Sequence, residues 1–259
     1  MKTLFHLFQT VAVAFSMFSA VPMPQFPWDA KNMRYALCAF PLIGVLIGGL
    51  GWLWWLVCGW LGFPALVRGA GLCLLPLWVT GGIHLDGYCD THDALASHAG
   101  PEKRQEILKD PHIGAFGVMR LCGYLLVSFV LWATLPDYAG VPIWLSFVLS
   151  RCLSGLAVAT FPLARGSGLA YTFAAAADKK RVARMLCVAS VLLVLALCWF
   201  RLRGMGMALV ALGIFVHYRR KSEREFGGLS GDLAGWFLQR AELGMLAALW
   251  LVEWLEGIV

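Results

Sequence analysis

A short polar segment in an otherwise apolar chain carries the residues best suited to chemistry. Residues 81–93 read Gly-Gly-Ile-His-Leu-Asp-Gly-Tyr-Cys-Asp-Thr-His-Asp and follow an apolar run over 72–79. On a helix, the spacings of Asp86, Asp90 and Asp93 place all three carboxylates on one face. Three like charges on one face repel each other, and carboxylate oxygens are hard ligands. The segment therefore predicts a site for Mg²⁺ or Mn²⁺.

Two other interpretations of this segment stay open. Acidic residues in the first turn of a helix can simply interact favourably with the helix dipole. A zinc site is the second alternative, because His84, Cys89 and His92 lie among the carboxylates. No C-x-x-C or H-E-x-x-H spacing supports zinc. Three carboxylates at the end of a strongly apolar run favour the hard divalent cation.

The composition is that of an integral membrane protein. Of the 259 residues, 60% are hydrophobic and 14% are charged, whereas soluble domains carry about 25% charged residues. The mean hydropathy is +0.73. The net charge of +6 fits basic loops on one side of a membrane and would help to attract an anionic substrate, so we expect no nucleic-acid partner. The eight cysteines are scattered without a C-x-x-C pair, which indicates reduced packing residues.

The apolar runs predict an all-α fold, a polytopic transmembrane bundle of about seven to eight membrane helices. We expect one domain over residues 1–259. The run at 4–21 follows Lys2 and resembles a signal peptide, but Phe18-Ser19-Ala20 is a poor cleavage site. We therefore expect a retained first helix, or one that lies in the interface. The other runs are 37–60, 63–79, 115–135, 143–161, 187–200, 205–216 and 233–254.

The basic residues gather in loops that alternating spans place on one side of the membrane. Arg201 and Arg203 are the exception. The positive-inside rule makes that side the cytoplasm. The acidic segment, Arg165 and the glycine-rich loop 227–232 fall on the same side, so we expect one cytoplasmic catalytic region, with a loop and a short helix within 81–114. The basic loops are 31–34, 103–109, 179–184 and 219–224.

Further polar residues are suited to binding phosphate. Arg151 lies in the middle of an apolar run, where an arginine has a function or pairs with an acidic residue. Gly228 and Gly231 precede a helix expected to begin near Asp232, so their N–H groups are placed to cradle an anion. Carboxylates that hold Mg²⁺ beside such groups suit phosphoryl transfer. No Walker A sequence is present, which argues against a P-loop NTPase.

Four segments in the right order, spread over nearly the whole chain, resemble the cobalamin synthase (adenosylcobinamide-GDP ribazoletransferase) family. Residues 81–93 resemble its G-G-x-H-x-D-G-x-x-D-x-x-D signature, and residues 106–117 are similar to its E-I-M-K-D-S-x-x-G-x-x-G. Residues 40–44 and 227–232 are similar to its F-P-x-x-G and G-G-x-T-G-D. The departures are small: Pro111 stands for a usual Ser, and Ser230 for Thr.

The resemblance implies a Mg²⁺-dependent, multi-pass transferase of the bacterial inner membrane. It would join adenosylcobinamide-GDP to α-ribazole, or to its 5′-phosphate, and release GMP; a homo-oligomer is one option for its assembly. The ribazole hydroxyl would attack the phosphorus next to the aminopropanol arm. The metal ligands implied are Asp86, Asp90, Asp93 and Asp232, the catalytic residues are Asp86, Asp90, His84 and Lys109, and the substrate-binding residues are Arg151, Arg165, Gly228, Gly231 and His112.

Two rival functions remain. A CDP-alcohol phosphotransferase of lipid metabolism also uses spaced Asp residues, but its signature expects Ala-Arg where Cys89-Asp90 stands. A cation- or proton-coupled transporter is the second rival, with Asp86 to Asp93 and Arg151 lining a path. Internal repeats would favour a transporter, and none is evident in the sequence.

Overall fold

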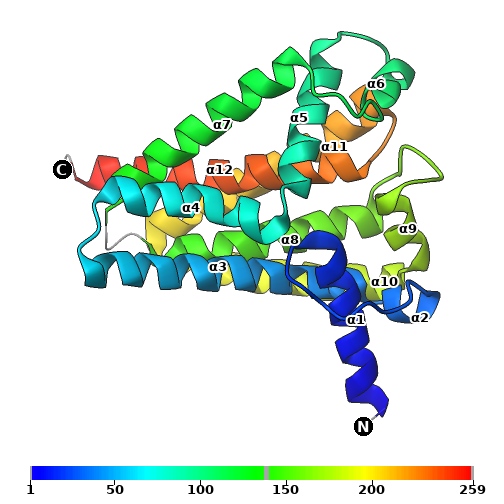
Figure 1. Cartoon of the computed structure of the whole chain (residues 1–259), viewed down its shortest axis with the longest axis horizontal. Helices are drawn as coiled ribbons and strands as arrows, with labels where there is room; N and C mark the ends of the chain where they lie inside the picture. The colour runs from blue at the N-terminus through cyan, green and yellow to red at the C-terminus, as the bar shows by residue number, and fades with distance from the viewer. Residues whose placement is uncertain (1, 137–139, 258–259) are drawn as a thin grey trace.

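The computed structural model describes residues 2–136 and 140–257, with the side chains of residues 2 and 3, including that of Lys2, outside the described part. In these residues the chain is all-helical, as expected, and contains no strand beyond one isolated bridge (Figure 1). The helices are α1 (Lys2–Phe18), α2 (Ala30–Met33), α3 (Ala36–Leu61), α4 (Ala65–Thr80), α5 (Ile83–Ala96), α6 (Pro101–Ile107), α7 (Ala115–Thr134), α8 (Val141–Thr160), α9 (Leu169–Ala176), α10 (Lys179–Cys198), α11 (Arg201–Phe226) and α12 (Gly231–Glu256).

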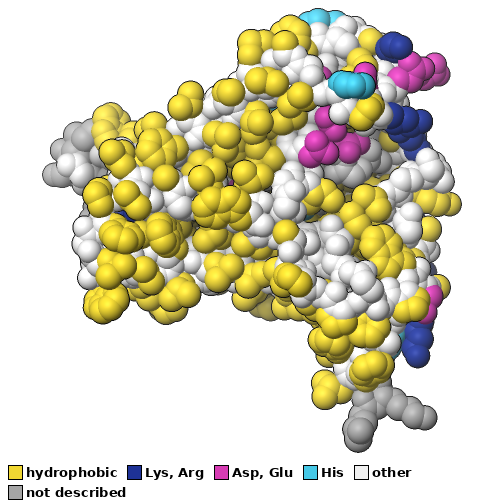
Figure 2. Space-filling view, in the orientation of Figure 1, with side chains coloured by type: hydrophobic (Ala, Val, Ile, Leu, Met, Phe, Trp, Pro, Cys, Tyr) yellow, Lys and Arg dark blue, Asp and Glu magenta, His cyan; other side chains and the backbone are white. Residues whose placement is uncertain are grey.

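The long helices form a bundle, and the short helices collect at one of its ends. α3, α4, α8 and α12 run along the long axis of the molecule, while α7 is inclined to them (Figure 1). The principal packing pairs are α3 with α8, α11 with α12, α5 with α12, and α8 with α10. α5 lies across the end of the bundle where α6 and α9 are also found (Figure 1). Most charged side chains visible in Figure 2 gather at this same end, and apolar side chains cover the rest of that face.

The apolar helices fit a multi-pass membrane protein. Among the described residues, α3, α7, α8 and α10 are long and apolar enough to cross a membrane, and the bent pair α4–α5 would make a fifth span. The expected seven to eight spans are therefore not confirmed. α11 and α12 are long, but basic residues at 219–224 interrupt the first, and Asp232, Arg240 and Glu242 interrupt the second. α1 is shorter and runs crosswise to α3 (Figure 1), which favours the interfacial alternative for this helix.

Two consecutive glycines turn the polar segment across the end of the bundle. Gly81 ends α4 with φ +64°, and Gly82 begins α5 with φ +83°. Residues with a Cβ rarely adopt this left-handed region, and glycine does so without strain. The two helices consequently meet at a bend of 94°. The bend carries the acidic residues of α5 away from the axis of the apolar helix that precedes them.

Two further glycines let α5 and α12 approach almost backbone to backbone. A Cβ on Gly87 would lie 2.7 Å from both the Cα and the carbonyl oxygen of Asp232. A Cβ on Gly235 would lie 2.7 Å from the carbonyl oxygen of His84. Both separations are shorter than carbon tolerates, so any side chain at either position would force the helices apart. This contact brings the acidic face of α5 to the first turn of α12.

Asp93 fixes the start of α7. Its two carboxylate oxygens accept hydrogen bonds from the N–H groups of Gly114 and Gly117, each at 2.8 Å. The first N–H groups of a helix have no partner within the helix, and an anion there also interacts favourably with its dipole. A Cβ on either glycine would lie 2.4 Å from a carboxylate oxygen of Asp93. The G-x-x-G spacing therefore makes room for a cap supplied by another helix.

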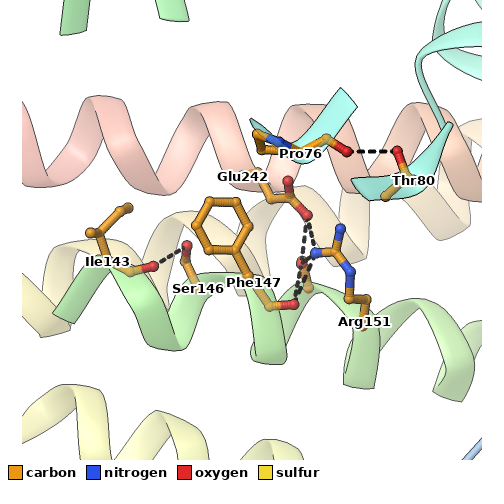
Figure 3. A network of polar contacts seen from close by, with 8 residues as sticks. Pro76, Thr80, Ile143, Ser146, Phe147, Arg151 and Glu242 are labelled. Atoms are coloured by element: carbon orange, nitrogen blue, oxygen red, sulfur yellow. Dashed lines mark hydrogen bonds and ion pairs between the residues drawn. The ribbon is translucent and has the colours of Figure 1, made fainter. Parts of the chain in front are cut away.

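A buried ion pair joins α8 to α12. The Arg151 guanidinium donates to the Glu242 carboxylate, and both side chains are almost fully buried (Figure 3). Arg151 also donates to the Phe147 carbonyl at 2.9 Å and to the Ser150 hydroxyl at 3.1 Å, and Ser150 donates to Glu242 at 2.9 Å. Opposite charges in a region of low dielectric stabilise each other only while both are present.

Replacement of Asp93 by alanine is expected to destabilise the protein by about 2 kcal/mol, because two charge-assisted hydrogen bonds to the start of α7 are lost. Gly117→Ala should have a similar effect, since its Cβ would displace the same carboxylate. Thermal unfolding of the purified variants in detergent measures both. A variant Asp93→Ala that unfolds like the wild type but loses divalent-cation binding would show instead that Asp93 is a metal ligand.

Glu242→Gln should destabilise the fold by about 3–5 kcal/mol, because it leaves the Arg151 charge buried without its counter-charge. The double variant Arg151→Met, Glu242→Leu should recover most of that loss. Glu223→Gln is the matched control: its partner Arg219 is 60% exposed, and such surface pairs contribute about 0–1 kcal/mol. Equal thermal unfolding of Glu242→Gln and Glu223→Gln would contradict a structural role for the buried pair.

Candidate functional site

Carboxylates from two distant segments meet at the end of the bundle. α5 is helical over residues 83–96, so Asp86 and Asp90, four residues apart, share one face. Asp86 is exposed and Asp90 is partly buried. Asp232 is in the first turn of α12 and lies against Gly87, the residue of α5 that follows Asp86. Asp93 is directed to the start of α7 and serves there as a cap.

The carboxylates are held close enough to repel each other. Burial, followed by the charges of Asp86 and Asp232, raises the pKa of Asp90 to about 7. Burial also raises the pKa of Asp232, although Ser230 and the charge of Arg165 oppose that effect. Both groups lie outside the four unbroken membrane helices. A cation between these groups would relieve the repulsion.

The chemistry of these donors fits a hard divalent cation. Carboxylate oxygens are the preferred protein ligands of Mg²⁺, which binds through one or two carboxylates and keeps waters or substrate phosphates as its other ligands. Among the described residues, no group of three or more His, Cys, Asp or Glu side chains is arranged to hold a metal by itself. The zinc alternative gains no support from the arrangement of the described His, Cys, Asp and Glu side chains.

A cavity of about 330 Å³ opens beside the carboxylates. Its polar end is formed by Asp86, Asp232 and His84. His84 is 5% exposed, and its Nδ1 has no hydrogen-bond partner within the described part of the chain. Burial and then the charge of Arg151 lower the pKa of His84 to about 3. The imidazole is therefore neutral and a weak acceptor for a proton. The apolar walls come from α1, α3, α8, α9 and α12.

The glycine-rich loop before α12 pairs with the loop after α8 and also contributes a residue to the cavity. Gly228 has φ +148°, and a Cβ there would lie 2.5 Å from the Ala164 nitrogen. Ala164 N–H donates to the Leu229 carbonyl at 2.9 Å, and Leu229 N–H donates to the Pro162 carbonyl at 2.8 Å. Gly228 thus allows two loops to pair. Gly231, the first residue of α12, lines the cavity.

The predicted basic residues occupy different positions around the site. Arg165 donates to the backbone and side-chain oxygens of Gln105 in α6, while its charge still acts on Asp232. Lys109 and His112 are exposed in the loop between α6 and α7. His112 Nδ1 is 2.8 Å from Asp110, whose charge reaches Asp90.

Arg151 does not reach the mouth of the site, because its guanidinium is fully buried and bound to Glu242. Arg151 therefore has the position expected from the alternative interpretation, in which it is a structural partner for an acidic residue.

The walls of the cavity were not among the residues expected to form a site. Phe18 of α1 lies 4.5 Å from Phe40 and 5.0 Å from Phe173 of α9, measured between ring centroids. Phe18 belongs to an apolar run that resembles a signal peptide, and α9 lies in a stretch without charged residues. Apolar side chains carry no chemical signal in the sequence, so only their position in the fold reveals them.

The comparison with known proteins agrees with the motifs. The family model described as Cobalamin-5-phosphate synthase matches residues 10–250. A protein of Lachnoclostridium phytofermentans, named Adenosylcobinamide-GDP ribazoletransferase, is 42% identical over 233 residues, which cover 89% of this chain and 89% of that protein. The protein of the same name from Desulfitobacterium hafniense is 36% identical over 239 residues, with 89% and 92% covered.

A third protein of that name, from Clostridium perfringens, is 30% identical over 236 residues, which cover 89% of this chain and 93% of that protein. No solved structure matches the chain significantly. The family model spans most of the sequence and includes all four segments on which the resemblance depends. The chain therefore belongs to the cobalamin-5-phosphate synthase family.

Proposed function

We propose that this protein transfers the adenosylcobinamide-phosphate group from adenosylcobinamide-GDP to α-ribazole, or to its 5′-phosphate, and releases GMP. One observation carries the proposal: the carboxylates of α5 and α12 meet at the mouth of a cavity. The names of the relatives supply the substrates. The reaction breaks the phosphoanhydride bond of the diphosphate and forms a phosphodiester. The ribazole hydroxyl forms a bond to the phosphorus next to the aminopropanol arm, the bond from that phosphorus to GMP breaks, and the hydroxyl loses its proton.

The carboxylates have distinct roles in this proposal. Asp90 accepts the proton, since a carboxyl with a pKa of about 7 is matched to proton transfer near neutral pH. His84, with its pKa near 3, is poorly suited to that task. Asp86 and Asp232 would hold Mg²⁺, and Asp90 would stay free to accept the proton. A bound Mg²⁺ supplies charge neutralisation for the phosphate oxygens and the leaving group.

Basic and backbone groups complete the site. Arg165, whose charge acts on Asp232, and Lys109 would supply positive charge to the leaving GMP, and His112 lies in the same exposed loop as Lys109. Gly231 is the first residue of α12 and lines the cavity, so its N–H is suited to donate to a phosphate oxygen. Asp93, Arg151 and Gly228 act through the fold, because they hold α7, α12 and the loop before α12 in place.

We infer that the site faces the cytoplasm of a bacterium, from the inner membrane. The positive-inside rule supports this orientation, because basic loops and the site share one end of the bundle (Figure 2). The two rival functions have less support. The relatives are transferases by name, which favours neither a transporter nor a lipid phosphotransferase. Cys89-Asp90 also departs from the lipid enzymes' signature.

Asp86→Asn and Asp90→Asn should each lower the rate of GMP release at least about 100-fold, because a metal ligand or the proton acceptor is lost. The assay uses purified protein in detergent with adenosylcobinamide-GDP, α-ribazole and Mg²⁺. Removal of divalent ions with EDTA should stop the reaction, and added Mg²⁺ should restore it.

Glu223→Gln is the control, because it removes one exposed negative charge from the same end of the bundle. This variant should keep the wild-type rate. Near wild-type GMP release by folded Asp86→Asn and Asp90→Asn would show that these carboxylates do not perform the reaction. Release that persists in EDTA would remove the metal from the proposal.

A further inference from the structure

We propose that the cavity beside Asp86 and Asp232 seats the aromatic base of the acceptor nucleoside, with His84 Nδ1 as its hydrogen-bonding partner. This inference rests on the proposed function. It assigns the acceptor nucleoside to one cavity, a position that the overall reaction does not specify. The acceptor, α-ribazole, is the riboside of 5,6-dimethylbenzimidazole, a flat and largely apolar bicyclic ring with two methyl groups.

The walls of the cavity match such a ring. The ring of Phe18 contacts those of Phe40 and Phe173 along one side, and Leu37 and Leu238 add aliphatic surface. Aromatic side chains pack well against flat heterocycles, and apolar walls stabilise apolar ligands by removing them from water. The corrin macrocycle is several times larger than a cavity of about 330 Å³ and must remain outside. A nucleoside is of the right size.

His84 provides the polar complement. Its Nδ1 is buried without a partner in the described part of the chain, which is unfavourable unless a ligand or water satisfies it. A neutral imidazole has one N–H donor and one acceptor nitrogen. When a benzimidazole is joined to ribose through one ring nitrogen, the other nitrogen is free to accept one hydrogen bond. An N–H at Nδ1 would satisfy both groups.

Guanine, the other bicyclic base among the substrates, fits this cavity less well. Its edge presents several donors and acceptors, and each needs a partner when buried. Apart from the two carboxylates at the mouth, the side chains that line the cavity offer few polar groups, chiefly His84 and Ser154. With the base inside, the ribose would lie at the mouth beside Asp86 and Asp232, where its hydroxyl is consumed.

A filled cavity tests the inference. Ala170, on α9, lines the cavity, whereas Ala175 on the same helix is exposed and does not. Ala170→Leu should raise the KM for α-ribazole at least about tenfold and the KM for the riboside of unmethylated benzimidazole less, because the added side chain competes with the methyl groups. Its KM for adenosylcobinamide-GDP and its kcat should stay near wild type. Ala175→Leu should leave every constant unchanged.

Direct binding separates this inference from the proposed function. Fluorescence titration of wild type and both variants with α-ribazole alone requires no turnover, and Ala170→Leu alone should bind weakly. Wild-type protein that makes no cobalamin product would refute the proposed function. Product formation with an unchanged KM for α-ribazole in Ala170→Leu, or a raised KM for adenosylcobinamide-GDP instead, would overturn the placement of the base. Should Ala170→Leu unfold at a lower temperature, Ala170→Val provides the same comparison with a smaller group.

Variants of His84 test whether its side chain contacts the base. His84→Phe should weaken α-ribazole binding at least about tenfold, and His84→Gln, which keeps an N–H donor, should recover part of that loss. A merely structural role would give equal losses in both variants and no preference between nucleosides. Wild-type affinity of folded His84→Phe for α-ribazole would show that His84 does not contact the base.

Discussion

The near contact between the backbones of α5 and α12 is the constraint on which the rest of the site depends. Gly87 lies against Asp232, and Gly235 lies against the carbonyl of His84. At this separation, carboxylates that are far apart in sequence share one small region, where burial and then their mutual repulsion raise the pKa values of Asp90 and Asp232. Placing these carboxylates close together is unfavourable in the free protein. It persists because the surrounding packing fixes the backbone positions of α5 and α12. A site for a cation and a diphosphate needs this concentration of negative charge to be built in advance.

Other polar residues link the helices to one another. Asp93 caps α7, Arg151 pairs with Glu242 between α8 and α12, and Arg165 ties the loop after α8 to α6. Each bond joins elements that are distant in sequence. In an apolar bundle, few directional contacts exist to fix the relative positions of helices. These buried polar links are therefore well placed to set the geometry at the mouth of the cavity.

The sequence predicted the helical class, the helix that carries Asp86 and Asp90, and the family, because periodicity and motif spacing are local properties. It could not separate ligands from positioning residues. Asp93 and Asp86 have the same chemistry, and only the location of α7 shows that Asp93 is its cap. The cavity walls formed by Phe18 and Phe173 were not predicted for a related reason, because the role of an apolar residue depends on its neighbours in the fold. The predicted number of spans is not confirmed, because charges within α11 and α12 weaken their apolar character.

Equilibrium binding of Mn²⁺, followed by electron paramagnetic resonance in place of Mg²⁺, tests the central claim most directly. The claim is that α5 and α12 jointly hold one divalent ion. One Mn²⁺ should bind per chain in the presence of the GDP-linked substrate, and Asp86→Asn and Asp232→Asn should each weaken it at least about tenfold. Wild-type Mn²⁺ affinity in Asp232→Asn, with Asp86→Asn impaired, would contradict the account, because α12 would then contribute nothing to the metal.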